Sequence, residues 1–316
     1  MLKSTHGKTH FDPKLVSNYV QKAKLHEKEQ IHADGGEVRS IYLELQELSA
    51  KEEGWIHSFW SDENHRMARF FWMNPCQVSL LQVYGDVLSV DTSENRNLYG
   101  WPLTTIIVVD GENRSRNVAH CLSKQQDHDL FVWFFRHIRL VYQKNRASIK
   151  LGVIFSDRAA AIASAIMEIW PEVSHLLCLF HLMNNIRENL ASVLGSSWSY
   201  FKQQFWRVYG MGSAETFYIA WEELLQTFPA AASYLRNNIF KDHQGWAWAF
   251  VGTKFCADMR TTGRVEVEHK HQKGIVGLGP TETLLRSFLR LNSRVEEQNE
   301  RAADDRRRVL SVLLSC

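Results

Sequence analysis

Three acidic residues carry the chemistry that this sequence can offer. Asp91 ends the segment YGDVLSVD, Asp157 ends KLGVIFSD, and Glu266 lies within TTGRVEVEHK. The two aspartates each follow a run of residues that favour β-strands, so a sheet could present both carboxylates at one edge. Carboxylate oxygens are the ligands that Mg²⁺ prefers, and a third acid could complete a site for two ions. The pattern predicts two-metal phosphoryl transfer.

Each of these acids also has a simpler interpretation. An aspartate at a strand end is usually a turn former, and Asp157, which precedes RAAAIASAI, could cap a helix. A glutamate in a charged helix, such as Glu266, is ordinarily exposed to solvent.

A cysteine and a histidine form a second short motif. Cys178 and His181 could supply a sulfur and a nitrogen ligand, but the sequence has no second pair nearby and a structural zinc ion takes four ligands. Such a pair is more often a buried thiol and a hydrogen-bonded histidine, and His181 could instead contact a phosphate near the acids. Zinc is therefore not expected from the sequence.

Composition and charge limit the class of protein. The 316 residues can hold one large domain or two ordinary ones. With 37 Lys and Arg against 35 Asp and Glu, the net charge is +2, so any basic surface must be local.

The five cysteines are scattered and odd in number, which favours reduced thiols and an intracellular location. No apolar run reaches the ~18 residues of a membrane span, so no membrane partner is expected.

The elements that must position the acids follow an α/β pattern. Residues 1–75 are expected to form a helical lead-in, helical over 14–53, with aromatic-rich extended segments from residue 55 that suggest the start of a sheet. Residues 76–185 should form the first part of the core, in the order β-β-β-α-β-α-β. This is the ribonuclease H-like arrangement of a mixed sheet, with flanking helices.

That arrangement lets the two aspartates meet. The first and fourth strands can lie side by side, although Asp91 and Asp157 are 66 residues apart (157 − 91 = 66). Residues 186–255 are rich in Trp and Phe without strand alternation, which predicts a helical insertion before the third acid. Residues 256–316 should complete the core and end in a long helix capped by Thr281.

The sequence resembles the transposase domain of Mutator-like elements (MULE), a group that also includes the plant far-red-impaired-response transcription factors. The resemblance runs from about residue 40 to about residue 300. It rests on SDENHRMARFFWMNP and YGDVLSVD before the first acid, on the FVWFF helix, on FSDRAAAIASAIMEIWPEVSHLLCLFH around the second acid, and on TTGRVE around the third.

The resemblance implies a DDE-type transposase, an enzyme that cleaves phosphodiester bonds at element ends and then transfers the strand. Asp91, Asp157 and Glu266 would be its catalytic triad and would hold two Mg²⁺ or Mn²⁺ ions, with Asp91 bridging both. Cys178 and His181 would be the C-x-x-H element of the family. The implied partners are terminal inverted repeats and target DNA in the nucleus, together with a second copy of the chain.

Local basic residues are the expected contacts to the DNA backbone. Arg264, Lys270 and Lys273 lie beside the third acid, and we expect them to bind DNA without sequence choice.

Two departures from the family pattern leave alternatives open. The first acid is followed by TSENRN instead of a Thr-Tyr-Lys-Thr-Asn type of sequence. After the third acid, the commoner Glu-Ser-x-Asn becomes EVEH, so Glu268 competes with Glu266, which the neighbours Thr261, Thr262 and Arg264 favour. The sequence also shows neither of the zinc motifs that often flank this domain. A domesticated, non-catalytic protein that binds DNA and regulates transcription is therefore the alternative.

Overall fold

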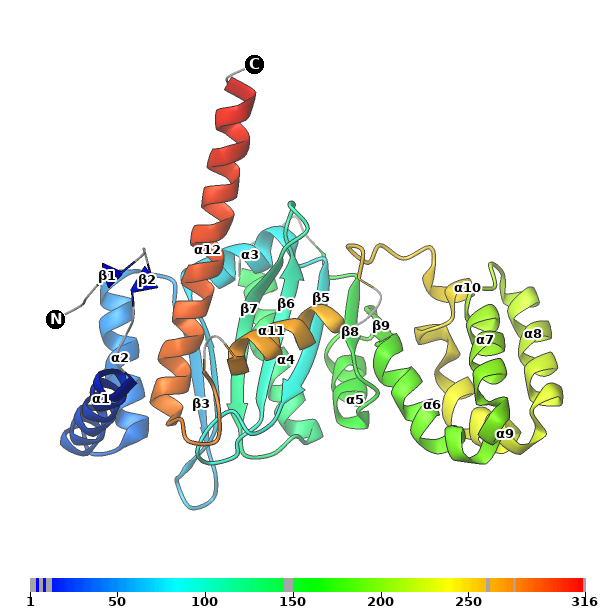
Figure 1. Ribbon diagram of the computed structural model, residues 1–316, viewed down its shortest axis with the longest axis horizontal. Helices are drawn as coiled ribbons and strands as arrows, with labels where there is room; N and C mark the ends of the chain where they lie inside the picture. Colours follow the sequence, from blue (N-terminus) through cyan, green and yellow to red (C-terminus); the bar gives the residue numbers. More distant parts are fainter. Residues whose placement is uncertain are drawn as a thin grey trace.

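The computed structural model describes residues 4–5, 8–9, 13–144, 150–259, 262–274 and 277–314. A seven-stranded mixed sheet forms the centre of the molecule, with helices on both faces and a separate helical region beyond one edge (Figure 1). The prediction of an α/β protein with a mixed sheet is confirmed.

The sheet has the order β3-β4-β7-β6-β5-β8-β9. The pairs β3–β4, β4–β7, β7–β6 and β6–β5 are antiparallel, whereas β5–β8 and β8–β9 are parallel. Its strands are β3 (Ile56–Ser61), β4 (Met67–Met73), β5 (Val87–Ser93), β6 (Leu103–Val109), β7 (Ser115–Ser123), β8 (Val153–Ser156) and β9 (Ser174–Leu177). A separate pair, β1 (Ser4–Thr5) and β2 (Lys8–Thr9), lies near the N-terminus.

The predicted order of core elements is present along the chain. After β5, β6 and β7 come α4 (His128–Lys144), β8, α5 (Ala160–Ile169) and β9. The turn between β6 and β7 is tight because Asp110 Oδ1 accepts hydrogen bonds from the backbone N–H groups of Glu112 (3.1 Å) and Arg114 (2.9 Å). Within this turn Asn113 adopts a positive φ of 61°.

One face of the sheet packs against an apolar helical layer. Alternation along β5 directs Leu88 and Val90 to this face, where they meet the aromatic side of α4 and the apolar sides of α5 and α3 (Pro75–Tyr84). A capping box fixes the start of α3, since Asn74 and Gln77 each accept a backbone hydrogen bond from the other at 2.9 Å. This layer forms the largest part of the core.

The opposite face carries the polar side chains of β5. Helices α2 (Glu37–Lys51), α11 (Gly263–Gly274) and α12 (Leu284–Leu314) cover it (Figure 1). Its apolar part, which includes Phe70, Trp72 and Phe288, lies toward β4 and α12. Asp91 lies toward α11, so the chemistry predicted from the sequence belongs to the face that α11 covers.

The described part of the N-terminal segment forms two helices, and two of its four strands join the central sheet. Helices α1 (Pro13–Ala33) and α2 are separated by Gly35 and Gly36, whose φ angles of 85° and 121° end the first helix. Residues 56–73 lie within the predicted lead-in and form β3 and β4, which extend the central sheet at one edge. The aromatic-rich segments from residue 55 are thus part of the sheet.

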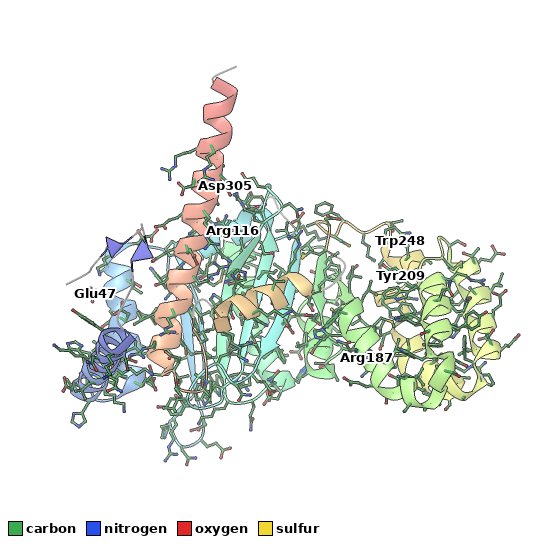
Figure 2. All side chains as sticks on the ribbon, viewed as in Figure 1. Glu47, Arg116, Arg187, Tyr209, Trp248 and Asp305 are labelled. Carbon is green, nitrogen blue, oxygen red and sulfur yellow. The ribbon has the colours of Figure 1, made fainter. Side chains whose placement is uncertain are left out.

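Helix α12 begins beside α2 and extends beyond the body of the molecule (Figure 1). Thr283 Oγ1, and not the predicted cap Thr281, accepts the hydrogen bond from the Arg286 backbone N–H at 3.0 Å. Further along, Asp305 forms an ion pair with Arg114 at 2.9 Å, and Arg116 lies next to the same helix (Figure 2). These contacts tie α12 to the β6–β7 hairpin.

The helical region after β9 has its own core. Trp and Phe side chains, including Phe205, Phe217, Trp221 and Trp246, are buried between its helices, as their pattern in the sequence predicted. Its elements are α6 (Leu179–Leu194), η1 (Gly195–Ser197), α7 (Trp198–Tyr209), α8 (Ala214–Thr227), α9 (Pro229–Tyr234), η2 (Leu235–Ile239), η3 (Phe240–Gly245) and α10 (Trp248–Val251). Arg158 joins this region to the sheet through Asp242 (Nε to Oδ2, 3.0 Å).

Candidate functional site

Asp91 and Asp157 lie at equivalent positions of neighbouring parallel strands. The pairing of β5 with β8 joins Val87 to Val153, an offset of 66 residues, and the same offset joins Asp91 to Asp157. The paired part ends at Ser89 and Phe155, so both acids lie just beyond the same end of it, on strands that are roughly 4.8 Å apart. The predicted meeting of these residues at one edge of the sheet agrees with this register.

Asp91 is largely buried beneath α11. Its side chain is only 12% exposed, and its Oδ2 lies 3.3 Å from Nδ1 of His269. Its strand partner on β6 is Thr105. A carboxylate in this position is held on both sides, by the sheet and by the helix that also carries Glu266.

Asp157 follows β8 and forms its own turn. Its Oδ1 accepts a hydrogen bond from the Ala159 backbone N–H at 3.0 Å, and α5 starts only after Ala159. Burial raises the pKa of Asp157, and the charge of Asp91 raises it further, while the Ala159 hydrogen bond and the charge of His181 oppose the shift. Asp157 is therefore a turn former, as its simpler interpretation predicted, and also a close electrostatic neighbour of Asp91.

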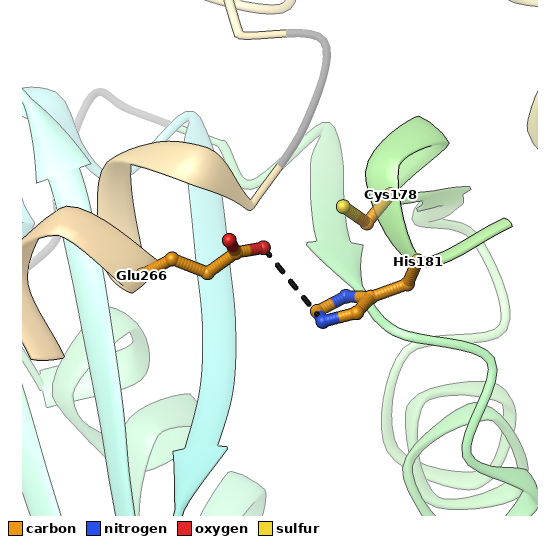
Figure 3. A group of neighbouring side chains, drawn as sticks. All are labelled: Cys178, His181 and Glu266. Carbon is orange, nitrogen blue, oxygen red and sulfur yellow. Dashed lines mark ion pairs between the residues drawn. The ribbon is translucent and has the colours of Figure 1, made fainter. Parts of the chain in front are cut away.

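Glu266 lies in the first turn of α11 and points toward α6. Its Oε1 accepts a hydrogen bond from Thr262 Oγ1 at 3.2 Å and lies 3.7 Å from His181 Nε2 (Figure 3). Its side chain is half-buried, so the solvent-exposed alternative does not describe it. Thr261, which helped to assign the third acid, lies outside the described residues.

His181 lies within electrostatic reach of all three acids. The hydrogen bond with Cys178 raises the pKa of His181 to about 9 against the opposing effect of burial, and the charges of Asp91 and Glu266 add to the rise. The charge of His181 in turn lowers the pKa of Asp157. Glu266 thus lies beside the imidazole ring of His181, and the charges of Asp91 and Glu266 act on the same ring and favour its protonated form.

Cys178 is buried at the start of α6, one turn before His181. Burial alone would raise the pKa of its thiol, but hydrogen bonds with His181 and Thr262 outweigh burial and lower it. The Thr262 backbone N–H points at Cys178 Sγ over 3.2 Å. Cys178, His181 and Glu266 each offer one ligand atom, and these atoms all lie within 4.8 Å of one another.

Glu268, the competing candidate for the third acid, faces the interior. Its carboxylate accepts hydrogen bonds from Asn117 Nδ2 (2.9 Å), Gln298 Nε2 (3.2 Å) and two nitrogens of Arg294 (3.0 and 2.9 Å). The Glu268 charge raises the pKa of Arg294 through these hydrogen bonds. With its oxygens occupied by four donors from β7 and α12, Glu268 anchors α11, and the geometry favours Glu266 as the third acid.

Of the three predicted DNA-binding residues, one is hydrogen-bonded within the protein and two are exposed to solvent. Arg264 donates hydrogen bonds to Asn113 in the β6–β7 turn, to its carbonyl oxygen at 3.0 Å and to its Oδ1 at 2.5 Å. Lys270 and Lys273 are exposed. On a helix, positions four and seven residues after Glu266 share its flank, so both lysines extend from the acid along the surface of α11.

Two residues at this site were not predicted from the sequence. His269 contacts Asp91, and Thr262 contacts both His181 and Glu266 through its hydroxyl. The signal for His269 was its spacing, since a residue three positions after Glu266 lies on an adjacent part of the helix surface. Thr262 gave no such signal, because its contacts with Cys178 and His181 come from another segment of the chain.

Across the described part of the chain, helices are too short or too polar to span a bilayer.

Comparison with known proteins shows which family of proteins the chain resembles. Residues 87–185 match the model of the MULE transposase domain, a stretch that contains Asp91, Asp157, Cys178 and His181. The chain is 23% identical to Protein FAR1-RELATED SEQUENCE 5 of Arabidopsis thaliana over 83% of its own length and 32% of the relative. It is 21% identical to Protein FAR1-RELATED SEQUENCE 11 of the same plant, over 80% of the chain and 36% of the relative.

A third relative is Protein FAR-RED IMPAIRED RESPONSE 1 of Arabidopsis thaliana, which is 20% identical over 65% of the chain and 24% of that protein. The chain therefore spans about a third of the length of the curated relatives that it matches. The resemblance predicted from the sequence is confirmed: the chain is similar to the MULE transposase domain and to the far-red-impaired-response proteins, which supports a transposase-derived protein.

Proposed function

We propose that the chain is the catalytic part of a DDE-type DNA transposase, a polynucleotidyl transferase that cleaves phosphodiester bonds at element ends and then transfers the strand. The observation that carries this proposal is that three separate segments bring acids to one region: β5 and β8 are paired, and Glu266 on α11 lies 3.7 Å from His181, whose charge acts on Asp157. The match of residues 87–185 to a transposase domain supports it.

The proposal includes a ribonuclease H-like core. Its support is the order β7-β6-β5-β8-β9, in which three antiparallel strands precede two parallel ones. Residues 76–185 and 256–316 would form this core, with residues 186–255 as the insertion and residues 1–75 as the lead-in. The third acid then follows the insertion and returns to the sheet on α11.

The donor set suits two Mg²⁺ or Mn²⁺ ions. Asp91, Asp157 and Glu266 supply carboxylate oxygens, the ligands that these hard cations prefer. The pKa of Asp157 is raised first by burial and then by the charge of Asp91. When bound, the ions would stabilise the negative charge that develops on the attacking and leaving oxygens. Asp91, Asp157 and Glu266 would together hold these ions.

The protein's own groups would orient the reaction. The turn at Ala159 fixes Asp157, Thr262 holds Glu266, and the anchor at Glu268 fixes the helix that carries Glu266. The charged ring of His181 would contact a phosphate oxygen of the DNA. Exposed Lys270 and Lys273 would hold the DNA backbone along α11, because phosphate contacts position a duplex without reading its sequence.

The proposed partners are the terminal inverted repeats and the target DNA, with a nuclear location and a second copy of the chain. These assignments rest on the similarity to MULE transposases.

A second candidate is a domesticated protein that binds DNA and regulates transcription without cleaving it. The observation that favours it is His269, whose Nδ1 lies 3.3 Å from Asp91 Oδ2 and would compete with a metal ion for that oxygen. The similarity to the FAR1-related proteins agrees with this candidate.

Nicking of supercoiled plasmid in Mn²⁺ separates the two candidates. For the enzyme we expect metal-dependent nicking that Asp91→Ala abolishes, while Asp129→Asn, which removes an exposed carboxylate on α4, leaves it unchanged. Equal nicking by wild type and Asp91→Ala would point to a contaminating nuclease. DNA binding without nicking in Mn²⁺ or Mg²⁺ would support the regulatory candidate.

A further inference from the structure

Three side chains of different chemistry converge between α6 and α11. Cys178 and His181 come from the start of α6, and Glu266 comes from the first turn of α11 (Figure 3). One ligand atom of each lies within 4.8 Å of the other two, and His181 Nε2 lies 3.7 Å from Glu266 Oε1. We propose that these three residues form a binding site for a transition-metal ion of the Zn²⁺ type, which shares Glu266 with the Mg²⁺ sites of the proposed reaction.

The separations suit a tetrahedral ion. Zinc bonds are about 2.3 Å to sulfur and about 2.0 to 2.2 Å to nitrogen and oxygen, so neighbouring ligand atoms in a tetrahedral site are roughly 3.3 to 3.7 Å apart. Side-chain rotations that shorten the longest separation by about 1 Å would close the site around the ion. Three protein ligands leave a fourth position for water, as in zinc sites that are not closed.

The donor types select the metal. Thiolate and imidazole ligands suit zinc and its neighbours in the transition series, whereas Mg²⁺ takes oxygen ligands. Cys178 therefore has no role as a ligand in the proposed two-metal site, and the inference goes beyond the proposed function. Glu266 is the residue common to both. An ion bound to Cys178 and to a neutral His181 would take the place of the proton on that ring and would also fix the orientation of the third acid.

The sequence alone could not show this site. It contains one C-x-x-H pair, and the third donor, Glu266, lies 88 residues after Cys178 (266 − 178 = 88). The pair alone offers two of the ligands of a zinc ion, which is why zinc was not expected. Packing of α11 against the start of α6 supplies the missing one.

Thr262 supports all three ligands at once. It is fully buried, its backbone N–H points at Cys178 Sγ (3.2 Å), and its Oγ1 lies 3.4 Å from His181 Nδ1 and 3.2 Å from Glu266 Oε1. Metal ligands are commonly oriented by such outer partners, which fix the direction of the donor atoms. Thr262 therefore holds the three donor atoms in place before an ion binds.

Cobalt(II) gives the direct test. We expect the full chain, stripped of metal by a chelator, to bind one equivalent of Co²⁺ with a thiolate-to-cobalt absorption band in the near ultraviolet, and Zn²⁺ to displace it. Cys178→Ser should lose that band. Cys256→Ser removes another buried thiol, far along the chain, and should keep it. Thr262→Val should lower the affinity for Zn²⁺ by roughly 10- to 100-fold.

The result that overturns the inference is equally clear. A wild-type chain that shows no thiolate band with Co²⁺, or a band of equal intensity in Cys178→Ser, excludes the site. If Cys178→Ser does not fold, the wild-type spectrum and the loss of Co²⁺ affinity in Glu266→Gln decide instead. Asp157→Asn should abolish nicking and leave the cobalt spectrum unchanged, so failure of the transposase proposal and failure of the metal site give different results.

Discussion

The carboxylate of Glu268 and the guanidinium of Arg294 form a buried ion pair between α11 and α12, with two hydrogen bonds of 3.0 and 2.9 Å. Both side chains are less than a tenth exposed. The pair holds α11 against the sheet two residues away from Glu266. The position of the third acid is therefore set by a contact that takes no part in the proposed chemistry.

Breaking this ion pair should destabilise the fold. Arg294→Met leaves the Glu268 charge buried with only Asn117 and Gln298 as donors, and we expect a loss of about 3–5 kcal/mol in the free energy of unfolding, measured in urea. Arg301→Met, in the exposed part of α12, is the control and should change it by less than about 1 kcal/mol. Similar losses in the two variants would mean that the pair contributes little.

Divalent metal should stabilise the folded chain. If Asp91, Asp157 and Glu266 bind Mn²⁺ only when folded, Mn²⁺ at 100 times its Kd adds about 2.7 kcal/mol to the free energy of unfolding and raises Tm. Calorimetry with Asp157→Asn should show a much smaller rise, and Asp129→Asn the same rise as wild type. An equal rise in Asp157→Asn would rule out a site that includes this residue.

The charge on His181 predicts a pH dependence of stability in chelator-treated protein. Because the pKa of His181 is raised to about 9 in the folded state by Cys178 and the acids, its contribution is fully present below the unfolded value of about 6.5. That contribution should be lost as pH rises from about 6.5 through about 9. Urea denaturation at several pH values should show this loss in wild type and a weaker one in His181→Gln.

The control for this experiment is His32→Gln, which removes an exposed histidine on α1. It should follow the wild-type profile. A His181→Gln profile that is parallel to wild type between pH 6.5 and 9 would contradict the assigned pKa.

DNA binding should depend on the exposed flank of α11. Replacing Lys270 and Lys273 by Ala should weaken binding to every duplex by a similar factor and reduce the salt dependence by about one unit of slope per lysine. Fluorescence anisotropy at several salt concentrations measures both. Lys202→Ala, on α7 of the helical region, is the matched control. Sequence-selective binding that does not respond to salt would favour the regulatory candidate.

Local patterns account for what the sequence predicted well. Asp91 and Asp157 each end a run of strand-forming residues, and the alternation of strands with apolar helices gives the order of the core. Their pairing follows, because the connection between parallel strands places both acids at the same edge. The cap of α12 is Thr283, two residues after the predicted Thr281. Helix ends are defined only to within one or two residues, so a sequence pattern does not fix the cap residue.

Contacts between distant segments account for what could not be predicted. The donors to Glu268 come from Asn117 and Arg294, which are 177 residues apart (294 − 117 = 177), so no local pattern relates them. The contact of His269 with Asp91 and the convergence of Glu266 on Cys178 depend on how α11 lies across the sheet. Helix α11 carries mostly polar and charged residues, so hydrophobic periodicity gave no information about the face that it buries.

Helix α12 extends beyond the body of the molecule, and its inner half holds Glu268 through Arg294 and Gln298 (Figure 1). If α12 shifts along its axis, either these hydrogen bonds break or α11 moves with it. The outer half of α12, which Asp305 ties to Arg114, and the third acid therefore belong to one connected unit, so a force on α12 would reach Glu266 through Arg294 and Glu268.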